Sequence, residues 1–476
     1  MLRPVGSDDV AFFRSIGVSC DVADEGRRRD WMRVYGPPAN VVTWVVLPET
    51  TLHVSRIMAY CFDRGIAITP QGGNTGLVGG SVPLSDELIL SLERMKAVER
   101  FDPYSGIVVC DAGITLGGLD QYVKAHGHTV PLDLGPRDVC QIGANIATNA
   151  GGLRFCRYGS LHGNVVGLEV VLADEDGTIL DLGIKTALQK DNTGYDVKQL
   201  FIGSEGTLGI ITRCAVKCPI DFQSVQLAWI RCPLFYDVLE VLLMAKSMLG
   251  EILSAFECLD HQSIGFARTV VDIDEQDNAL WSDSKLLDGY FIIIETRGSN
   301  RKHDMEKLGD LLRQIRHPTV LCTEALQRDV WKIRTSVSAG LRKSGVTFKY
   351  DVSLPIESME PMMTATRHRL LEQGAHGRTR TCGFGHLLDG NLHVNVSCEP
   401  AYEEETRAIL EPWLYEEVAR LHGSISAEHG IGCMKAAAFS SIKDGRVVKT
   451  MRALKSMFDR RGMLNPMKIF YEQPGS

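Results

Sequence analysis

The segment G-H-L-L-D-G-N-L-H-V-N-V, residues 385–396, constrains the fold more than any other stretch of the chain. Asp389 and Gly390 form a favoured dipeptide for a two-residue hairpin turn, and such a turn would place His386 directly opposite His393. Directly opposed residues of an antiparallel pair have Cβ atoms roughly 5 Å apart on one face of the sheet. The segment therefore predicts a β-hairpin that holds two imidazoles close enough to share a small cation.

Three further residues extend this pattern. Asn395 lies two positions beyond His393 and so points to the same face of the strand. Further along, A-E-H-G-I-G supplies Glu428 as a third potential ligand and His429 as a residue that can carry protons. Two nitrogen ligands, one carboxylate and an open position are typical of a catalytic Zn²⁺ site. The alternative is a hairpin with two polar residues on a solvated face, and the Glu-His pair favours the metal.

Composition excludes several classes of protein. The 476 residues exceed the size at which one hydrophobic core usually stops growing, so we expect at least two domains. The chain carries 51 Lys and Arg against 59 Asp and Glu, a net charge of −8, which argues against nucleic acid as a partner. No apolar stretch approaches the ~20 residues of a transmembrane helix. The 13 cysteines include no Cys-x-x-Cys, which predicts a reducing compartment without iron–sulfur ligation.

Changes in pattern along the chain predict three zones. In residues 1–218, short β-rich runs alternate with glycine-rich loops and helical stretches, which indicates an α+β or α/β domain. In residues 219–434, longer amphipathic segments alternate with strands such as Y-F-I-I-I-E-T, which indicates a second, α+β domain. Residues 435–476 contain one helical period that ends at Gly462, and we expect this C-terminal segment to return to the first domain.

Three glycine-rich loops lie in the first zone, at residues 70–81, 143–160 and 202–212. Glycine permits positive φ and lets successive N–H groups turn toward an anion such as a pyrophosphate. Neither a Rossmann G-x-G-x-x-G nor a Walker G-x-x-x-x-G-K occurs, so Rossmann-bound nicotinamide and P-loop ATP chemistry lose support. One such loop is usually only a turn, but three with Ser, Thr and Asn donors predict a long phosphate-containing ligand.

Seven segments, in order along nearly the whole chain, closely resemble the FAD-linked 2-hydroxyacid dehydrogenases of the vanillyl-alcohol-oxidase superfamily. They are P-Q-G-G-N-T-G-L-V-G-G-S-V-P, A-T-N-A-G-G-L-R-F, R-Y-G-S-L-H-G, D-N-T-G-Y-D, Q-L-F-I-G-S-E-G-T-L-G-I-I-T, G-H-L-L-D-G-N-L-H-V-N-V and A-E-H-G-I-G. The resemblance implies a two-domain α+β fold. It assigns a PCMH-type FAD-binding domain of two α+β subdomains to residues 1–218, and an α+β substrate-binding cap domain with an antiparallel sheet to residues 219–434.

The resemblance also implies which residues surround FAD. Family members that tether FAD through the first loop carry a histidine at the position of Asn74, so we expect the flavin to be non-covalent. The implied FAD-binding residues are Pro70, Gly72, Gly73, Asn74, Thr75, Gly76, Ser81, Pro131, Leu132, Gly135, Gly143, Ala144, Thr148, Gly151, Gly152, Gly206 and Ile211.

For the substrate, the family pattern falls on Arg334, Ser338, Lys349, Asn395 and His429. A dicarboxylate needs cations at its far end, where Arg offers a planar fork and Lys a point charge. Arg334 and Ser338 are four residues apart and so share one helix face. The alternative is that Arg334 only makes a surface ion pair.

For the reaction, the resemblance implies oxidation of a D-2-hydroxy acid, D-2-hydroxyglutarate foremost, with hydride transfer to flavin N5. His386, His393 and Glu428 would hold a divalent metal, Zn²⁺ being expected, and His429 would be the catalytic base. D-lactate or another D-2-hydroxy acid is the near alternative. A non-redox FAD-dependent alkyl transferase and a flavin-binding protein without turnover are more distant ones.

The resemblance further suggests electron-transfer flavoprotein as electron acceptor and the mitochondrial matrix as location. The chain begins M-L-R-P-V-G-S-D-D, without the pattern of a transit peptide, so a cytoplasmic location is the alternative. The oligomeric state stays open. Leu388 in the hairpin and Ala144 in the second FAD loop stand where the family usually has glycine, and Ser338 stands where threonine is expected but keeps the hydroxyl. Of these departures, the bulky Leu388 next to the turn bears on substrate preference.

Overall fold

The computed structural model describes residues 2–30, 34–271 and 288–470. The chain forms two compact units. The first comprises residues 1–151, 158–221 and 428–476, and the second residues 152–157 and 222–427. Each unit has its own sheets and its own buried apolar side chains.

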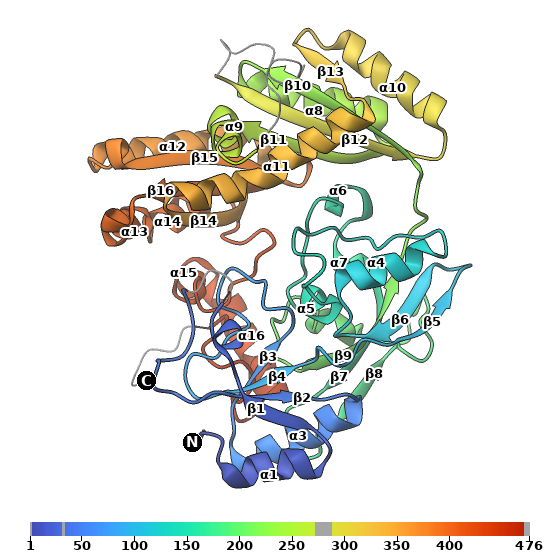
Figure 1. Ribbon diagram of the computed structural model, residues 1–476, viewed down its shortest axis with the longest axis vertical. Coiled ribbons are helices and arrows are strands. Elements are labelled where there is room, and N and C mark those ends of the chain that lie inside the picture. Colours follow the sequence, from blue (N-terminus) through green and yellow to red (C-terminus); the bar gives the residue numbers. More distant parts are fainter. Residues whose placement is uncertain (1, 31–33, 272–287, 471–476) are drawn as a thin grey trace. The chain divides into compact units, whose positions relative to one another are not determined.

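The first unit contains two sheets (Figure 1). The four-stranded sheet has the order β1-β2-β4-β3, with parallel β2–β4 and β3–β4 pairs, and the five-stranded sheet has the order β5-β6-β9-β7-β8 and is antiparallel. Their strands are β1 (Ser19–Val22), β2 (Trp44–Leu47), β3 (Ile68–Gln71), β4 (Leu88–Ser91), β5 (Val98–Asp102), β6 (Ile107–Asp111), β7 (Val165–Val171), β8 (Ile179–Leu182) and β9 (Ile210–Lys217).

Short helices connect and cover these strands. Helix α3 buries five apolar side chains, Val54 to Phe62, in the core of the four-stranded sheet, and Gly65 ends it in the left-handed conformation that glycine favours. The helices of this unit include α1 (Ser7–Ser15), α2 (Glu25–Arg28), α3 (Thr51–Arg64), α4 (Leu116–Lys124), α5 (Ile142–Ala147), α7 (Leu161–Asn164), α15 (Ala436–Ile442) and α16 (Gly445–Phe458).

The C-terminal segment packs within the first unit. The backbone of Ile68 in β3 accepts a hydrogen bond from Asn465 and donates one to Met463. The side chain of Asn465 donates to the carbonyl oxygens of Gly80 and Glu205, both at 2.8 Å. One asparagine of the tail thus joins the first and third glycine-rich loops.

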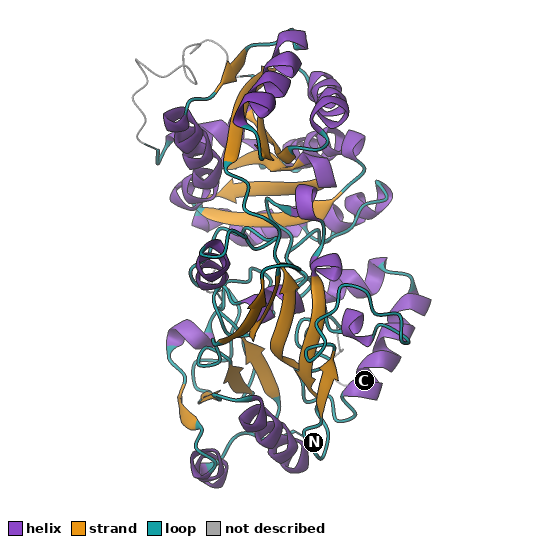
Figure 2. Cartoon of the chain, turned by 90° about the vertical axis from the view of Figure 1, so that its right-hand side faces the viewer, coloured by secondary structure: helices purple, strands orange, loops and turns teal. Residues whose placement is uncertain are grey.

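The second unit is built on one seven-stranded sheet with the order β13-β10-β12-β11-β15-β16-β14, in which every pair is antiparallel. Figure 2 shows helices on both sides of these strands. The strands are β10 (Ser224–Cys232), β11 (Leu253–Asp260), β12 (Tyr290–Gly298), β13 (Thr319–Leu321), β14 (Val346–Ser353), β15 (Thr379–His386) and β16 (Asn391–Cys398). The helices include α8 (Phe235–Leu249), α9 (His261–Arg268), α10 (Arg301–Gln314), α11 (Glu324–Ser344), α12 (Met359–Glu372), α13 (Glu403–Leu410) and α14 (Trp413–Arg420).

Helix α11 illustrates how sequence sets packing in this unit. The hydroxyl of Thr323 caps its first turn by accepting from the Leu326 N–H. Its buried side chains, Val330, Ile333, Val337 and Leu341, recur every three or four residues and face the sheet. Each such burial contributes roughly 1.5–3 kcal/mol.

The hairpin predicted at residues 385–396 forms, but the predicted two-residue turn is wrong. Four residues, 387–390, separate β15 from β16, and the partner of His393 is Phe384 rather than His386. The cause is the turn itself, in which a 3₁₀ segment of Leu387–Asp389 precedes Gly390 at φ +80°. A two-residue shift preserves the face of each side chain, so both histidines still share one face.

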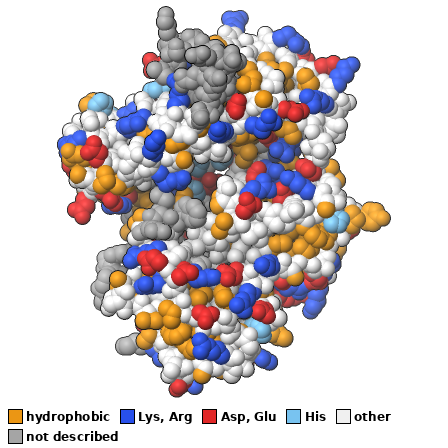
Figure 3. All heavy atoms as spheres, in the orientation of Figure 1, with side chains coloured by type: hydrophobic (Ala, Val, Ile, Leu, Met, Phe, Trp, Pro, Cys, Tyr) orange, Lys and Arg blue, Asp and Glu red, His pale blue; other side chains and the backbone are white. Residues whose placement is uncertain are grey.

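The predicted α+β class is confirmed, including the antiparallel sheet of the second unit. Within the described residues, no helix is both long and apolar enough to cross a bilayer. On the face drawn in Figure 3, basic and acidic side chains are interspersed among the described residues of each unit.

Gly390 provides a test of the hairpin turn. Gly390→Ala would put an alanine at positive φ and place its Cβ atom 2.9 Å from the Leu354 carbonyl oxygen. We therefore expect the free energy of unfolding to fall by about 1–3 kcal/mol. Gly374 has φ +71° and no atom within 4 Å of an added Cβ, so Gly374→Ala should lower the free energy of unfolding only through the cost of positive φ. Gly377 also has open space and has no positive φ, so Gly377→Ala should leave the free energy of unfolding almost unchanged. Thermal unfolding of the three variants measures this order, and equal losses would contradict the turn geometry.

Candidate active site on the seven-stranded sheet

Two rows of paired residues cross strands β14, β16 and β15 on one face of the sheet. Asp351, His393 and Phe384 form the first row, and Lys349 with Asn395 belongs to the second. These rows share a face because directly opposed and alternate residues of paired strands point the same way. Between them on β14, Tyr350 is buried toward the opposite face, 1% exposed.

Glu257 of β11 extends this face and binds two of the residues singled out in the sequence. Its Oε1 atom lies 2.5 Å from Nδ1 of His386, its partner across the β11–β15 pair. Its Oε2 atom accepts from Nε of Arg334 on α11 at 2.7 Å. The Arg334 guanidinium also lies over the Phe384 ring, 4.6 Å from its centroid. Arg334 is therefore held in a buried ion pair, and His386 in a hydrogen bond to a carboxylate.

The electrostatics of Glu257 follow from these two partners. Burial alone would raise the pKa of this carboxyl, but His386 and Arg334 outweigh burial and lower the pKa to about 2. The carboxylate is thus ionised across the physiological range. A buried anion of this kind requires paired, hydrogen-bonding partners.

Potential metal ligands also include His393 and the carboxylate of Asp351. Nδ1 of His393 lies 3.5 Å from Oδ1 of Asp351, its partner across the β14–β16 pair. Glu428 and His429 follow directly on Ala427, whose N–H donates to Oδ2 of Asp351 at 3.1 Å. Imidazole and carboxylate groups suit Zn²⁺, so the chemistry of the expected ligands His386, His393 and Glu428 fits a divalent metal.

His386 and His393 lie close together in the second unit, with ring centroids 5.7 Å apart. His386 contacts Glu257, and His393 lies beside Asp351. The third ligand expected from sequence, Glu428, belongs to the first unit. The expected base, His429, has its Nε2 atom 3.6 Å from Oε1 of Glu428.

Four of the expected substrate-binding residues lie on this sheet face or on helix α11, and the fifth, His429, belongs to the first unit. Lys349 is paired across the strands with Asn395, which is 2% exposed. Burial, with a smaller effect of Arg342, lowers the pKa of Lys349 to about 8. Ser338 is one helical turn beyond Arg334 on α11.

Two residues of this site, Asp351 and Glu257, were missed by the sequence analysis. Glu257 carried a detectable signal, because it is the charged residue inside the apolar run S-A-F-E-C-L and therefore had to find a partner. Asp351 ended a strand-like segment that already contained Lys349, and alternation placed both on one face. Neither pattern identifies the partners of Glu257 or Asp351, because these partners lie on other elements of the chain.

In the first unit, the three glycine-rich loops meet. A Cβ atom at Gly72 would lie 2.6 Å from Cβ of Ala144, and one at Gly206 would lie 2.5 Å from Cγ of Pro70. Gly206 has φ +69°. These close approaches account for glycine at both positions, since a side chain would separate the loops.

Two observations show that these loops fit a bound cofactor. Asn145, in helix α5 of the second loop, is 6% exposed, and its Oδ1 atom is buried without a hydrogen-bond partner among the described residues. A buried acceptor of this kind requires a donor, which a ligand can supply. A Cβ at Gly76 or Gly135 would meet nothing within 4 Å, so space is open beside the first loop and the α4–α5 loop.

Other expected FAD-binding residues stabilise the loops themselves. Asn74, at φ +51°, donates to the backbone of Gly26 and Arg29 and accepts from the Ser81 hydroxyl at 2.8 Å. Thr148 caps α5 through its hydroxyl. The remaining residues lie in the first loop (Gly73 and Thr75), the α4–α5 loop (Pro131 and Leu132), α5 (Gly143), the segment after it (Gly151 and Gly152) and β9 (Ile211).

Glu205 connects the third glycine-rich loop to the segment that follows His429. Its two carboxylate oxygens accept from the backbone N–H groups of Ile431 and Gly432 at 2.8 and 2.7 Å. All three residues belong to the first unit. Glu205 thereby orders the A-E-H-G-I-G segment from the loop that contains Gly206, a role that the sequence analysis did not assign.

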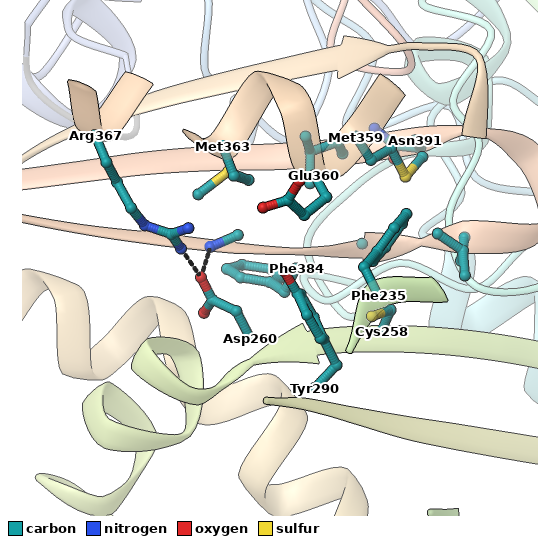
Figure 4. A pocket seen from close by; sticks show the side chains of 14 residues that line it. Phe235, Cys258, Asp260, Tyr290, Met359, Glu360, Met363, Arg367, Phe384 and Asn391 are labelled. Carbon is teal, nitrogen blue, oxygen red and sulfur yellow. Dashed lines mark hydrogen bonds and ion pairs between the residues drawn. The ribbon is translucent and has the colours of Figure 1, made fainter. Parts of the chain in front are cut away.

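A small cavity lies on the opposite face of the seven-stranded sheet (Figure 4). Helix α12 lines it with Met359, Glu360, Met363 and Arg367. Asp260 binds Arg367 at 2.7 Å and the N–H of Gly383 at 2.9 Å, and it also caps α9. None of the expected site residues lines this cavity, and Asp260 serves to fasten β15 to its neighbours.

Comparison with known families identifies the class of protein. Residues 222–469 match the family described as FAD linked oxidases, C-terminal domain, and residues 42–183 match the FAD binding domain. The chain belongs to the FAD-linked oxidases, and FAD is its cofactor.

Curated relatives are similar over nearly the full length. The chain is 42% identical to the probable D-2-hydroxyglutarate dehydrogenase, mitochondrial, of Oryza sativa subsp. indica, covering 98% of this chain and 82% of that protein. It is also 42% identical to the mitochondrial D-2-hydroxyglutarate dehydrogenase of Bos taurus, covering 98% and 84%. Among solved structures, an alkyldihydroxyacetonephosphate synthase has a TM-score of 0.75 at 16% identity, covering 97% of this chain and 85% of that one. This last likeness concerns the fold alone.

Proposed function

We propose that this protein catalyses the FAD-dependent oxidation of D-2-hydroxyglutarate to 2-oxoglutarate with the help of a divalent metal, Zn²⁺ in particular. The observation that carries the proposal is that two cations, Arg334 and Lys349, lie at the same sheet face as His393 and Asp351. A substrate with carboxylates at both ends needs such an arrangement, because one end reacts while the other is held. The relatives from Oryza and Bos bear the name of this activity.

The metal would be held by His386, His393 and Glu428. Nδ1 of His386 is engaged by Glu257 and Nδ1 of His393 lies 3.5 Å from Asp351, so each imidazole has a carboxylate beside it. Metal-ligating histidines commonly have their second nitrogen bound to a carboxylate in this way. Asp351 supports the site and is an additional potential ligand.

When bound, FAD supplies the hydride acceptor at flavin N5, and the cation polarises the substrate hydroxyl. His429 accepts the hydroxyl proton, since imidazole titrates near neutral pH. Loss of this proton and of the C2 hydride converts the alcohol into the 2-oxo acid. Arg334 and Lys349 hold the distal carboxylate, with Ser338 and Asn395 as hydrogen-bond donors to the substrate. The proposed flavin is non-covalent, because Asn74 stands where family members that tether FAD through this loop carry a histidine.

Two further parts of the proposal concern the cell. Electron-transfer flavoprotein is the proposed acceptor of the reducing equivalents, because the chain has no nicotinamide-binding motif. The mitochondrial matrix is the proposed location, because the relatives from Oryza and Bos are named mitochondrial.

The test is the anaerobic absorbance of the metal-replete protein mixed with D-2-hydroxyglutarate, its L-enantiomer or D-lactate. We expect rapid bleaching of the flavin band with D-2-hydroxyglutarate, slower bleaching with D-lactate, and none with the L-acid. Bleaching by D-lactate alone would assign a different D-2-hydroxy acid. With FAD bound and no bleaching by any of the three, the dehydrogenase proposal would fail and an alkyl-transfer activity would be tested next.

His429→Asn should leave FAD and metal content unchanged. We expect it to slow flavin reduction by about 10²–10⁴-fold, the usual loss when a general base is removed. Stopped-flow absorbance measures the rate, and Gln262→Asn, which changes a polar residue of α9 outside the proposed site, serves as the matched control. Reduction at the wild-type rate would exclude His429 as the base.

Lys349 should make substrate binding dependent on pH. Its pKa lies at about 8, so its positive charge is present below pH 8 and is lost as the pH rises through that value. We expect KM for D-2-hydroxyglutarate to rise roughly tenfold between pH 7 and pH 9, because the fraction of Lys349 that is protonated falls by roughly this factor. Lys349→Arg, which stays charged, should remove this step, and D-lactate, which lacks the distal carboxylate, should not show it. If KM of Lys349→Arg still rose in the same way between pH 7 and pH 9, the pH dependence would belong to another group.

A further inference from the structure

Glu257 stands in the middle of a strand in which every residue is buried. Its side chain is 2% exposed, and both oxygens are used, one by His386 of β15 and one by Arg334 of α11. The same carboxylate therefore connects a proposed metal ligand with a proposed substrate-binding arginine. These two partners are 52 residues apart in the chain, and the Glu257 carboxylate on β11 joins them.

His386 and Arg334 both direct an N–H donor at Glu257, so the side chain at position 257 must accept two hydrogen bonds. With a carboxylate at Nδ1, neutral His386 carries its proton there, so Nε2 carries the lone pair that a metal needs. Arg334 directs Nε to Glu257, so its two terminal nitrogens form the end of the fork that a substrate carboxylate can meet. An acceptor with two equivalent oxygens satisfies both demands at once.

We propose that Glu257 is a shared positioning residue, which fixes His386 for the metal and Arg334 for the distal carboxylate of the substrate. The inference rests on the proposed function, its first half on the metal site alone and its second half on the dicarboxylate substrate as well. Through Glu257, metal affinity and dicarboxylate preference depend on one side chain that touches neither metal nor substrate.

The isosteric change Glu257→Gln is the sharpest test. The amide has one acceptor and one donor, whereas both partners are donors. If the amide oxygen faces His386, its NH₂ group opposes Arg334. If the amide is turned over, NH₂ faces Nδ1 and forces the proton to Nε2, which then cannot ligate. In either orientation one of the two connections is lost.

The chain contains a matched control in Glu295 of the neighbouring strand β12. This carboxylate is also buried, 3% exposed, and it accepts from Arg297 at 2.8 Å and from the Ser254 hydroxyl at 3.1 Å. Neither partner belongs to the proposed site. Glu295→Gln therefore removes a buried charge from the same sheet and the same kind of arginine pair without touching a ligand.

The FAD-loaded wild type, Glu257→Gln and Glu295→Gln would be compared in two measurements. Zinc affinity is measured first without substrate, by competition with a chromophoric chelator. We expect a 10–100-fold weaker affinity in Glu257→Gln, the usual loss when such a carboxylate partner is removed, and wild-type affinity in Glu295→Gln. Equal affinity in all three proteins, or equal losses in both variants, would overturn the His386 half of the proposal.

The second measurement uses saturating zinc and compares KM for D-2-hydroxyglutarate and D-lactate. We expect Glu257→Gln to raise KM at least fivefold for the dicarboxylate, with little change for D-lactate and for FAD content. Equal increases for both substrates, or no increase, would overturn the Arg334 half. If the wild-type flavin is reduced by neither acid, the proposed function fails, and the zinc comparison still decides the role of Glu257 toward His386.

Discussion

The antiparallel placement of β16 between β14 and β15 is the constraint on which the candidate site depends. This pairing brings Asp351, His393 and Phe384 into one row and Lys349 and Asn395 into the next. Because neighbouring strands lie about 4.8 Å apart, side chains from distant parts of the chain are held within contact distance by backbone hydrogen bonds. The site thus stands on three hydrogen-bonded strands of the second unit.

Polar side chains on this face are stabilised by pairing. Glu257 is buried but satisfied by Arg334 and His386, and Asp351 receives hydrogen bonds from Asn391 and Ala427. On the opposite face of the same sheet, Asp260 likewise accepts hydrogen bonds from Arg367 and from the N–H of Gly383. Buried carboxylates therefore fasten the central strands on both faces, and on one face they also orient groups suited to chemistry.

In the first unit, glycines determine how closely the loops approach each other, because they have no side chain. Gly72 and Gly206 permit the glycine-rich loops to approach Ala144 and Pro70 more closely than any Cβ atom would allow. The loops are held in place by Asn74, Glu205 and Asn465, whose side chains bond to backbone groups. Among the residues that the structure describes, the buried Oδ1 atom of Asn145 has no hydrogen-bond partner, and a bound cofactor can supply the missing donor.

The sequence by itself determined which residues are available and which local structures they prefer. Alternation predicted the shared face of His393 and Asn395, and the Asp-Gly dipeptide predicted a hairpin, because both depend on neighbours in the chain. The predicted turn was too short, because Leu387–Asp389 form a 3₁₀ turn that Gly390 ends in the left-handed conformation. Only the tertiary structure decided that Glu257 joins His386 to Arg334 and that Asp351 stands beside His393. Such partnerships join elements far apart in the chain, and they form because a buried charge must find a partner wherever the strand order places one.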